Sequence, residues 1–253
     1  MASSETTPGF VPKLKSADEQ KECKIQEERH MYGKGNSHVC FTEGKGIKRG
    51  PHDLVLDSSE GFIPLWGKEV ILRWEFDEAS LAFYQDSDGI KNYVRQLMNE
   101  ALNLWGASVP VRFSENPNVW DFQVSIAPSN NCDPTGACTL ARAFFPAPGR
   151  NSLLLFPRMF DQVYKEQLDT IVHEMGHIFG LRHFFAPKLE TRWPSEIFGN
   201  HEAFSIMNYG DMSELTERDL SDLANLYEAA WSGELETING TPIRFIRPYH
   251  EQA

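Results

Sequence analysis

The stretch HEMGHIFGLRH, residues 173–183, constrains the fold more than any other part of this chain. His173 and His177 are four residues apart, a spacing that places both side chains on one face of a helix, one turn apart. Gly180 can adopt backbone conformations that other residues avoid, so the chain can turn sharply there and bring His183 back towards the first two histidines. The stretch therefore predicts a helix, a tight turn and three converging imidazoles.

Three converging imidazoles are a ligand set for zinc, and they leave the fourth position of the ion open to water or substrate. An open position is typical of catalytic zinc and not of structural zinc. Glu174 is rotated away from direct coordination, but it can accept a proton from an attacking water. We therefore predict one catalytic Zn²⁺ ion bound by His173, His177 and His183, with Glu174 as general base and acid. The alternative, ordinary histidines on an amphipathic helix, has to explain all the matching positions at once.

The same stretch resembles the zinc-binding consensus of the metzincin peptidases, in which a later turn carries a methionine beneath the metal. SIMNYG, residues 205–210, fits such a turn, with Met207 24 residues after His183 and Tyr209 two residues further on. The resemblance implies a zinc-dependent endopeptidase, in which Tyr209 is a switchable ligand or donates a hydrogen bond to the oxyanion. A turn tyrosine is the simpler alternative. Phe184 follows His183 where matrixins, astacins and serralysins have Ser, Glu and Pro, so the resemblance is to the superfamily and not to one family.

A weaker resemblance to the matrixins covers roughly residues 68–232. ARAFFP (141–146) resembles their edge strand, which pairs with an extended substrate, and LTERDLSDLANLY (215–227) resembles their final helix. Arg142 stands where matrixins have a histidine ligand for a second, structural zinc, so we do not expect that ion here. The acidic residues show no clear calcium-loop spacing, and calcium binding is left open.

Hydrophobic patterning predicts an α+β fold, with a twisted mixed sheet, two long helices and a small C-terminal subdomain with one helix. The run VILRWEF is typical of a strand, and further strand patterns follow it. The expected strands are 70–76, 111–115, 121–127, 139–146 and 152–157. Apolar residues with helical spacing predict a first helix from about Asp88, a possible N-cap, to Trp105, and a second helix at roughly 162–180, ended by Gly180. Thr216 and Asp219 have the spacing of a capping box at the start of a third helix, which Gly233 should end.

Domain organisation follows from the change in composition near residue 67. Residues 1–67 are rich in Lys, Glu, Ser, Gly and Pro and are expected to be an extended, loosely ordered N-terminal extension or a pro-segment. Residues 68–253 are expected to form the catalytic domain, with an upper subdomain at 68–180 and a lower one at 181–253. We expect the last twenty residues to lie over the surface as a tail.

Four cysteines are present, and turn residues between Cys132 and Cys138 make a small loop disulfide and two free thiols about equally plausible. Cys23 and Cys40 lie outside the Pro-Arg-Cys-Gly context of the matrixin cysteine switch. They are therefore interpreted as a disulfide, as thiols, or, less plausibly, as a thiolate lid on the zinc.

Composition limits the remaining classes of function. The net charge is −12 and Lys and Arg do not cluster, which argues against a nucleic-acid partner. No apolar run approaches the roughly 18 residues of a membrane helix, and no secretory signal is visible, which leaves the compartment open. We expect a monomer acting on a peptide or protein substrate. The alternative is a metzincin-fold zinc protein that acts on a non-peptide small molecule or serves as a binding module.

Overall fold

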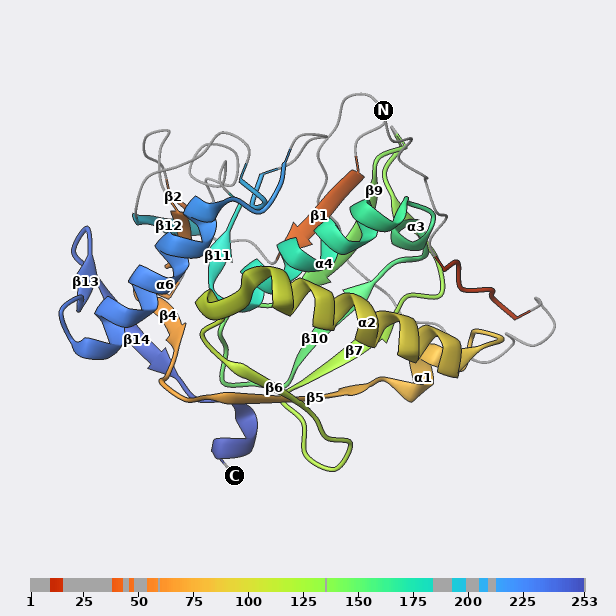
Figure 1. Cartoon of the computed structure of the whole chain (residues 1–253), viewed down its shortest axis with the longest axis horizontal. Coiled ribbons are helices and arrows are strands. Elements are labelled where there is room, and N and C mark those ends of the chain that lie inside the picture. The colour runs from red at the N-terminus through yellow and green to blue at the C-terminus, as the bar shows by residue number, and fades with distance from the viewer. Residues whose placement is uncertain are drawn as a thin grey trace.

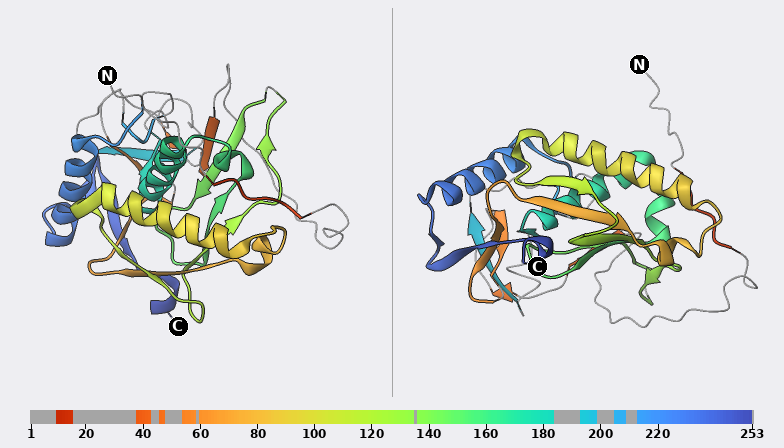
Figure 2. Two further views of the ribbon diagram at one scale, coloured as in Figure 1. Left: turned by 45° about the vertical axis from the view of Figure 1, so that its right-hand side comes forward. Right: turned by 90° about the horizontal axis from the view of Figure 1, so that it is seen from below.

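The computed structural model describes residues 10–15, 38–42, 46–47, 54–58, 60–134, 136–183, 193–198, 205–208 and 213–252. These residues form the expected α+β fold. Helices α2 (Ser87–Trp105) and α4 (Tyr164–Ile178) lie side by side on one face of a mixed sheet, as Figures 1 and 2 show. None of the described helices is both long and apolar enough to cross a membrane.

The main sheet has seven strands in the order β1-β9-β10-β7-β5-β6, with β8 paired to β9. β9 runs antiparallel to β8 and β10, whereas the other pairs are parallel. All five strands predicted between residues 70 and 157 are present. The strands are β1 (His38–Thr42), β5 (Ile71–Phe76), β6 (Arg112–Glu115), β7 (Phe122–Ile126), β8 (Asn131–Cys132), β9 (Cys138–Ala143) and β10 (Asn151–Leu155). Cys132 and Cys138 form the loop disulfide between β8 and β9.

The predicted cap of α2 was wrong by two residues. Asp86 is the N-cap, and its carboxylate accepts a hydrogen bond from the N–H of Gly89 at 2.8 Å. Asp88 instead lies in the first helical turn, where a negative charge is favourable beside the positive end of the helix dipole. Short helices α1 (Glu78–Leu81) and η1 (Gly106–Ser108) flank α2.

The motif helix α4 is shorter than the expected 162–180 and is preceded by a separate helical turn, α3 (Pro157–Phe160). Proline is favourable at the first position of a helix, which explains why Pro157 starts α3 directly after β10. Gly180 has a φ of +96° and reverses the chain just after α4.

Part of the N-terminal segment expected to be loosely ordered is built into the fold. Strand β3 (Leu54–Asp57) lies in a four-stranded sheet of order β11-β3-β12-β2, and β4 (Ile63–Trp66) lies in a three-stranded sheet of order β13-β14-β4. Every residue of β4 is buried. The other strands are β2 (Gly46–Ile47), β11 (Leu181–Arg182), β12 (Trp193–Phe198), β13 (Thr237–Ile238) and β14 (Thr241–Ile246).

The C-terminal segment is also not a simple surface tail. β14 pairs in parallel with β4, with Ile243 opposite Ile63. Figure 1 shows β14 in blue beside β4 in orange. The last turn, η2 (Tyr249–Glu251), is fixed to the main sheet, because His250 Nδ1 lies 2.9 Å from the buried carboxylate of Asp121. The C-terminal segment therefore packs on β4 and on Asp121, directly before β7.

Helix α6 (Glu217–Ser232) has the predicted start and end. Thr216 and Asp219 form the capping box, and Gly233 ends the helix with a φ of +81°. Buried residues of α6 share one continuous hydrophobic core with β4, the main sheet, α2 and α4. Helix α6 thus belongs to the same core as α4, the helix that carries the first two histidines.

Candidate metal centre

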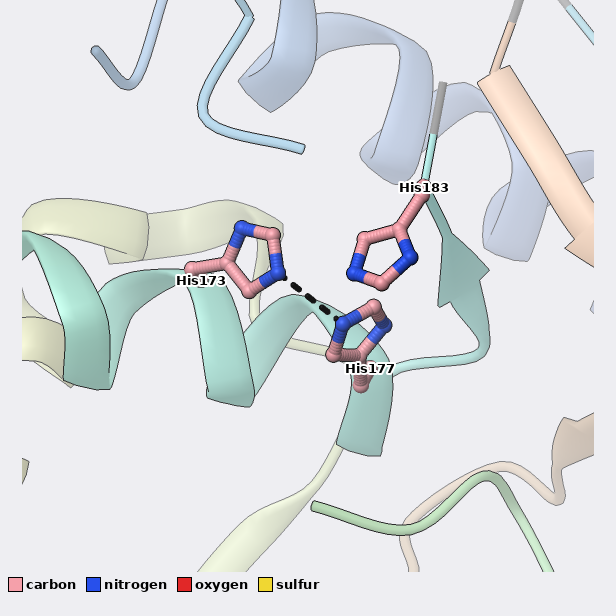
Figure 3. Close-up of side chains that lie close together, drawn as sticks. All are labelled: His173, His177 and His183. Atoms are coloured by element: carbon pink, nitrogen blue, oxygen red, sulfur yellow. Dashed lines mark hydrogen bonds between the residues drawn. The ribbon is translucent and has the colours of Figure 1, made fainter. Parts of the chain in front are cut away.

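The structure brings together the three histidines predicted to bind zinc. His173 and His177 project from α4, and His183 follows β11, so that the rings converge from two elements (Figure 3). One nitrogen from each ring can be chosen so that all three lie within 4.8 Å of one another. No other group of at least three His, Cys, Asp or Glu side chains of this kind occurs in the described ranges.

Backbone carbonyls fix the orientation of two of these rings. Nδ1 of His173 lies 2.7 Å from the carbonyl oxygen of Ile206, and Nδ1 of His177 lies 2.7 Å from that of Leu181. Because a carbonyl oxygen can only accept, each Nδ1 carries the proton and each Nε2 keeps its lone pair. The two Nε2 atoms are 3.0 Å apart. Tetrahedral zinc with Zn–N bonds of about 2.0–2.1 Å needs roughly 3.3 Å, so the pair fits the ion with a small shift.

The protonation state of His177 also suits a metal. Burial, together with the neighbouring imidazoles of His173 and His183, lowers the pKa of His177 well below its usual value. At neutral pH the ring is therefore uncharged, which is the form that binds a metal ion.

The turn between the second and third histidines is held by two distant side chains. Trp66 Nε1 donates to the carbonyl of Ile178 at 2.7 Å, and the hydroxyl of Tyr227 donates to that of Phe179 at 2.9 Å. The last carbonyls of a helix lack partners within the helix, and a buried helix end needs such donors. Strand β4 and helix α6 thus complete the turn that places His183.

Met207 lies directly behind the motif helix. A Cβ added to Gly176 would overlap the sulfur of Met207, so a larger residue at this contact requires the Met207 side chain to shift. The turn of Met207 is tied to α6, because Ser205 Oγ donates to the carboxylate of Asp219 at 2.6 Å and accepts from the N–H of Met207 at 3.1 Å. The sequence prediction missed Gly176, although a glycine inside a helix and between two ligands was a visible signal.

Of the two predicted catalytic residues, the structure describes Glu174 but not Tyr209. Glu174 is fully buried on α4, next to His173. Tyr209 lies outside the described residues. Trp66 and Tyr227 were not predicted as site residues, and no local spacing marks them, because Trp66 is 112 residues from its partner.

The strand expected at the edge of the main sheet has a neighbour on each side. β9 pairs with β10, and it also pairs in parallel with β1, with His38 opposite Cys138 and Val39 opposite Thr139. A strand from the N-terminal segment therefore lies beside β9, which is not an edge strand in this structure.

Comparison with known proteins agrees with the geometry of the histidines. The family model for matrixins matches residues 73–190, a region that runs from within β5 to beyond β11 and contains the whole HEMGHIFGLRH stretch. The chain has no match among curated proteins. The solved structures include a similar chain, described as the structure of myroilysin, with 12% identity and a TM-score of 0.41 over 68% of this chain and 98% of that one. The matrixin match confirms the resemblance to the metzincin-like zinc metallopeptidases.

Proposed function

We propose that this protein is a zinc-dependent endopeptidase, with His173, His177 and His183 as the ligands of one catalytic Zn²⁺ ion. The observation that supports this most directly is the convergence of the three imidazoles, two of which have Nδ1 bonded to a backbone carbonyl. The match of residues 73–190 to the matrixin model supports the same class of chemistry. When bound, zinc supplies Lewis-acid polarisation and makes water a nucleophile at neutral pH.

Glu174 is proposed to move the protons. It follows His173 on α4 and is fully buried. In the proposed reaction it accepts a proton from the water that attacks the scissile carbonyl. It then donates that proton to the leaving amine, which balances the hydrolysis.

Tyr209 is proposed to donate a hydrogen bond to the oxygen of the scissile carbonyl as negative charge develops on it. The support for this role is its place in SIMNYG, two residues after Met207, which packs behind the motif helix. Replacing Tyr209 with Phe should lower kcat about 10²- to 10³-fold with a smaller change in KM, because the contact forms mainly in the transition state.

The test is digestion of a peptide library by the purified protein beside the Glu174→Ala variant and a chelator-treated sample. We expect cleavage with a positional preference, which is lost in both controls and returns when Zn²⁺ is added to the chelated wild type. Cleavage that survives Glu174→Ala contradicts the mechanism. Bound zinc without cleavage favours the alternative of a small-molecule enzyme or a binding module.

A further inference from the structure

Asp57 and Arg182 form an ion pair beside the third predicted ligand. Arg182 comes immediately before His183 and its side chain is fully buried. Its Nη1 lies 3.8 Å from Oδ1 of Asp57, whose side chain is 12% exposed. The carboxylate belongs to β3 in the N-terminal segment, outside the region that matches the matrixin model.

Backbone pairing connects the same two elements. β3 runs antiparallel to β11, with Leu56 opposite Leu181 and Val55 opposite Arg182. The carbonyl of Leu181 also accepts the hydrogen bond from His177 Nδ1. The two residues of β11 therefore orient one predicted ligand and directly precede another, while β3 fixes their position.

The pair also affects the electrostatics of the predicted metal site. An arginine side chain stays protonated in proteins, so Arg182 puts a buried positive charge next to a site for a divalent cation. Positive charges in a poorly solvated interior repel each other strongly, and a buried charge without its partner is costly. The carboxylate of Asp57 offsets the charge of Arg182 at that place.

We propose that Asp57 is a positioning residue for the proposed zinc site. Its carboxylate neutralises Arg182, while the backbone pairing of β3 holds β11 in place, so that the three histidines can hold a divalent cation. This inference rests on the proposed function only for the identity of the ion, Zn²⁺. Residues 54–57 (β3) thereby support the metal centre, although they lie in the segment interpreted from the sequence as an extension or pro-segment.

The experiment measures the Zn²⁺ affinity of the full chain by competition with a chelator, for Asp57→Asn and Arg182→Met separately. Both variants break the same ion pair, but they change the local charge in opposite directions. We expect Asp57→Asn to lose about 10- to 100-fold in affinity, as is typical for groups that support metal ligands. Arg182→Met should keep the wild-type affinity or exceed it. Asp57→Glu, which retains the charge, should recover most of the loss.

The matched control is Asp121→Asn. Asp121 is another buried carboxylate with a side-chain partner, the imidazole of His250, but it directly precedes β7 of the main sheet and contacts the C-terminal turn. This variant should lose thermal stability and keep its Zn²⁺ affinity. A purely structural role for Asp57 predicts equal losses in Asp57→Asn and Arg182→Met, and that result overturns the proposal, as does unchanged affinity in Asp57→Asn. If Asp57→Asn does not fold, Arg182→Met decides: affinity at or above wild type supports the proposal, and a tenfold loss overturns it.

Zn²⁺ binding and peptide cleavage by the wild-type protein distinguish an error about Asp57 from an error in the proposed function. Wild type that binds Zn²⁺ but cleaves no peptide contradicts the endopeptidase and leaves the affinity test of Asp57 valid. Wild type that cleaves peptides while Asp57→Asn binds Zn²⁺ normally contradicts Asp57 alone. Wild type that binds no Zn²⁺ overturns both.

Discussion

The indole of Trp66 donates its N–H to the carbonyl oxygen of Ile178 at 2.7 Å, which joins an N-terminal strand to the end of the motif helix. Ile178 and Phe179 lie between the second and third predicted ligands, so the position of His183 depends on this contact. The hydroxyl of Tyr227 makes the equivalent bond to Phe179 from helix α6. The arrangement of the histidines is thus maintained by two elements far apart in the sequence, β4 and α6.

Replacing Trp66 with Phe should therefore affect the metal site as well as stability. The variant leaves a buried carbonyl without this donor, at a cost of about 1–3 kcal/mol in the free energy of unfolding. We expect weaker Zn²⁺ binding in a chelator competition, together with the lower stability in a urea titration. Trp231→Phe is the control, because Trp231 Nε1 donates to the backbone carbonyl of Trp66 at 3.0 Å and not to a carbonyl of the turn that carries His183. Equal Zn²⁺ affinity in wild type and Trp66→Phe would contradict this account.

Because Gly176 packs against Met207, we expect Gly176→Ala to destabilise the protein, the opposite of the usual effect in a helix interior. In a helix interior, Gly→Ala normally stabilises by about 1 kcal/mol. Here the added methyl group overlaps the sulfur of Met207, and overpacking of this kind costs about 1–3 kcal/mol. Gly176→Ala should therefore lower the melting temperature, and Met207→Ala in the same chain should relieve the overlap. If Gly176→Ala alone raises the melting temperature, Met207 is not packed against the helix as described.

The pKa of His177 predicts how the metal-free protein responds to acid. Burial and the two neighbouring imidazoles lower this pKa in the folded state, whereas the unfolded state keeps the usual value near 6.5. Below pH 6.5 the unfolded state therefore binds more protons, and the free energy of unfolding should fall by up to about 1.4 kcal/mol per pH unit for this group. Above pH 6.5 the ring is neutral in both states, and His177 does not make the free energy of unfolding depend on pH. As pH falls from 6.5 towards the folded-state pKa, His177 destabilises the folded state increasingly.

Urea titrations of chelated protein between pH 5 and pH 8 measure this effect. Replacing His177 with Gln removes the titrating group, so the variant should show a flatter dependence below pH 6.5. A wild-type curve as flat as that of His177→Gln would show that the folded state accepts the proton on His177 at little cost.

Much of the fold and the candidate site could be predicted from local sequence patterns. The strands from Ile71 to Leu155 and the capping box of Thr216 and Asp219 depend on neighbouring residues, and they were found. The convergence of the histidines was also predictable, because helical spacing and the glycine before His183 indicate it.

What could not be predicted is the long-range pairing that supports the site. Ile63 and Ile243 pair across the length of the chain, and Asp57 meets Arg182 only after β3 joins β11. Neither contact has a local spacing, because strand pairing depends on the whole fold. The polar composition of residues 1–67 as a whole therefore suggested a loose segment, although the part from 54 to 66 is largely apolar and contributes buried side chains to the core.

The pairing of β1 with β9 gives the last prediction. An extended peptide adds to a sheet through the unpaired N–H and C=O groups of a strand, and β1 already occupies those groups on one side of β9. If a substrate uses that side, β1 must leave first, and weakening β1 should increase cleavage. The variant His38→Pro/Val39→Pro removes two consecutive N–H donors, one of which must face β9, because alternate groups of a strand point to opposite sides.

We expect the double proline variant to cleave peptides faster than wild type, by about tenfold for each 1.4 kcal/mol of pairing free energy that is lost. His38→Ala/Val39→Ala keeps both N–H groups and is the matched control, which should remain close to wild type. Both variants retain residues 54–57, so the support of β11 by β3 is unchanged. Equal rates in the proline variant and wild type would show that the substrate does not compete with β1, and that β1 belongs permanently to the sheet.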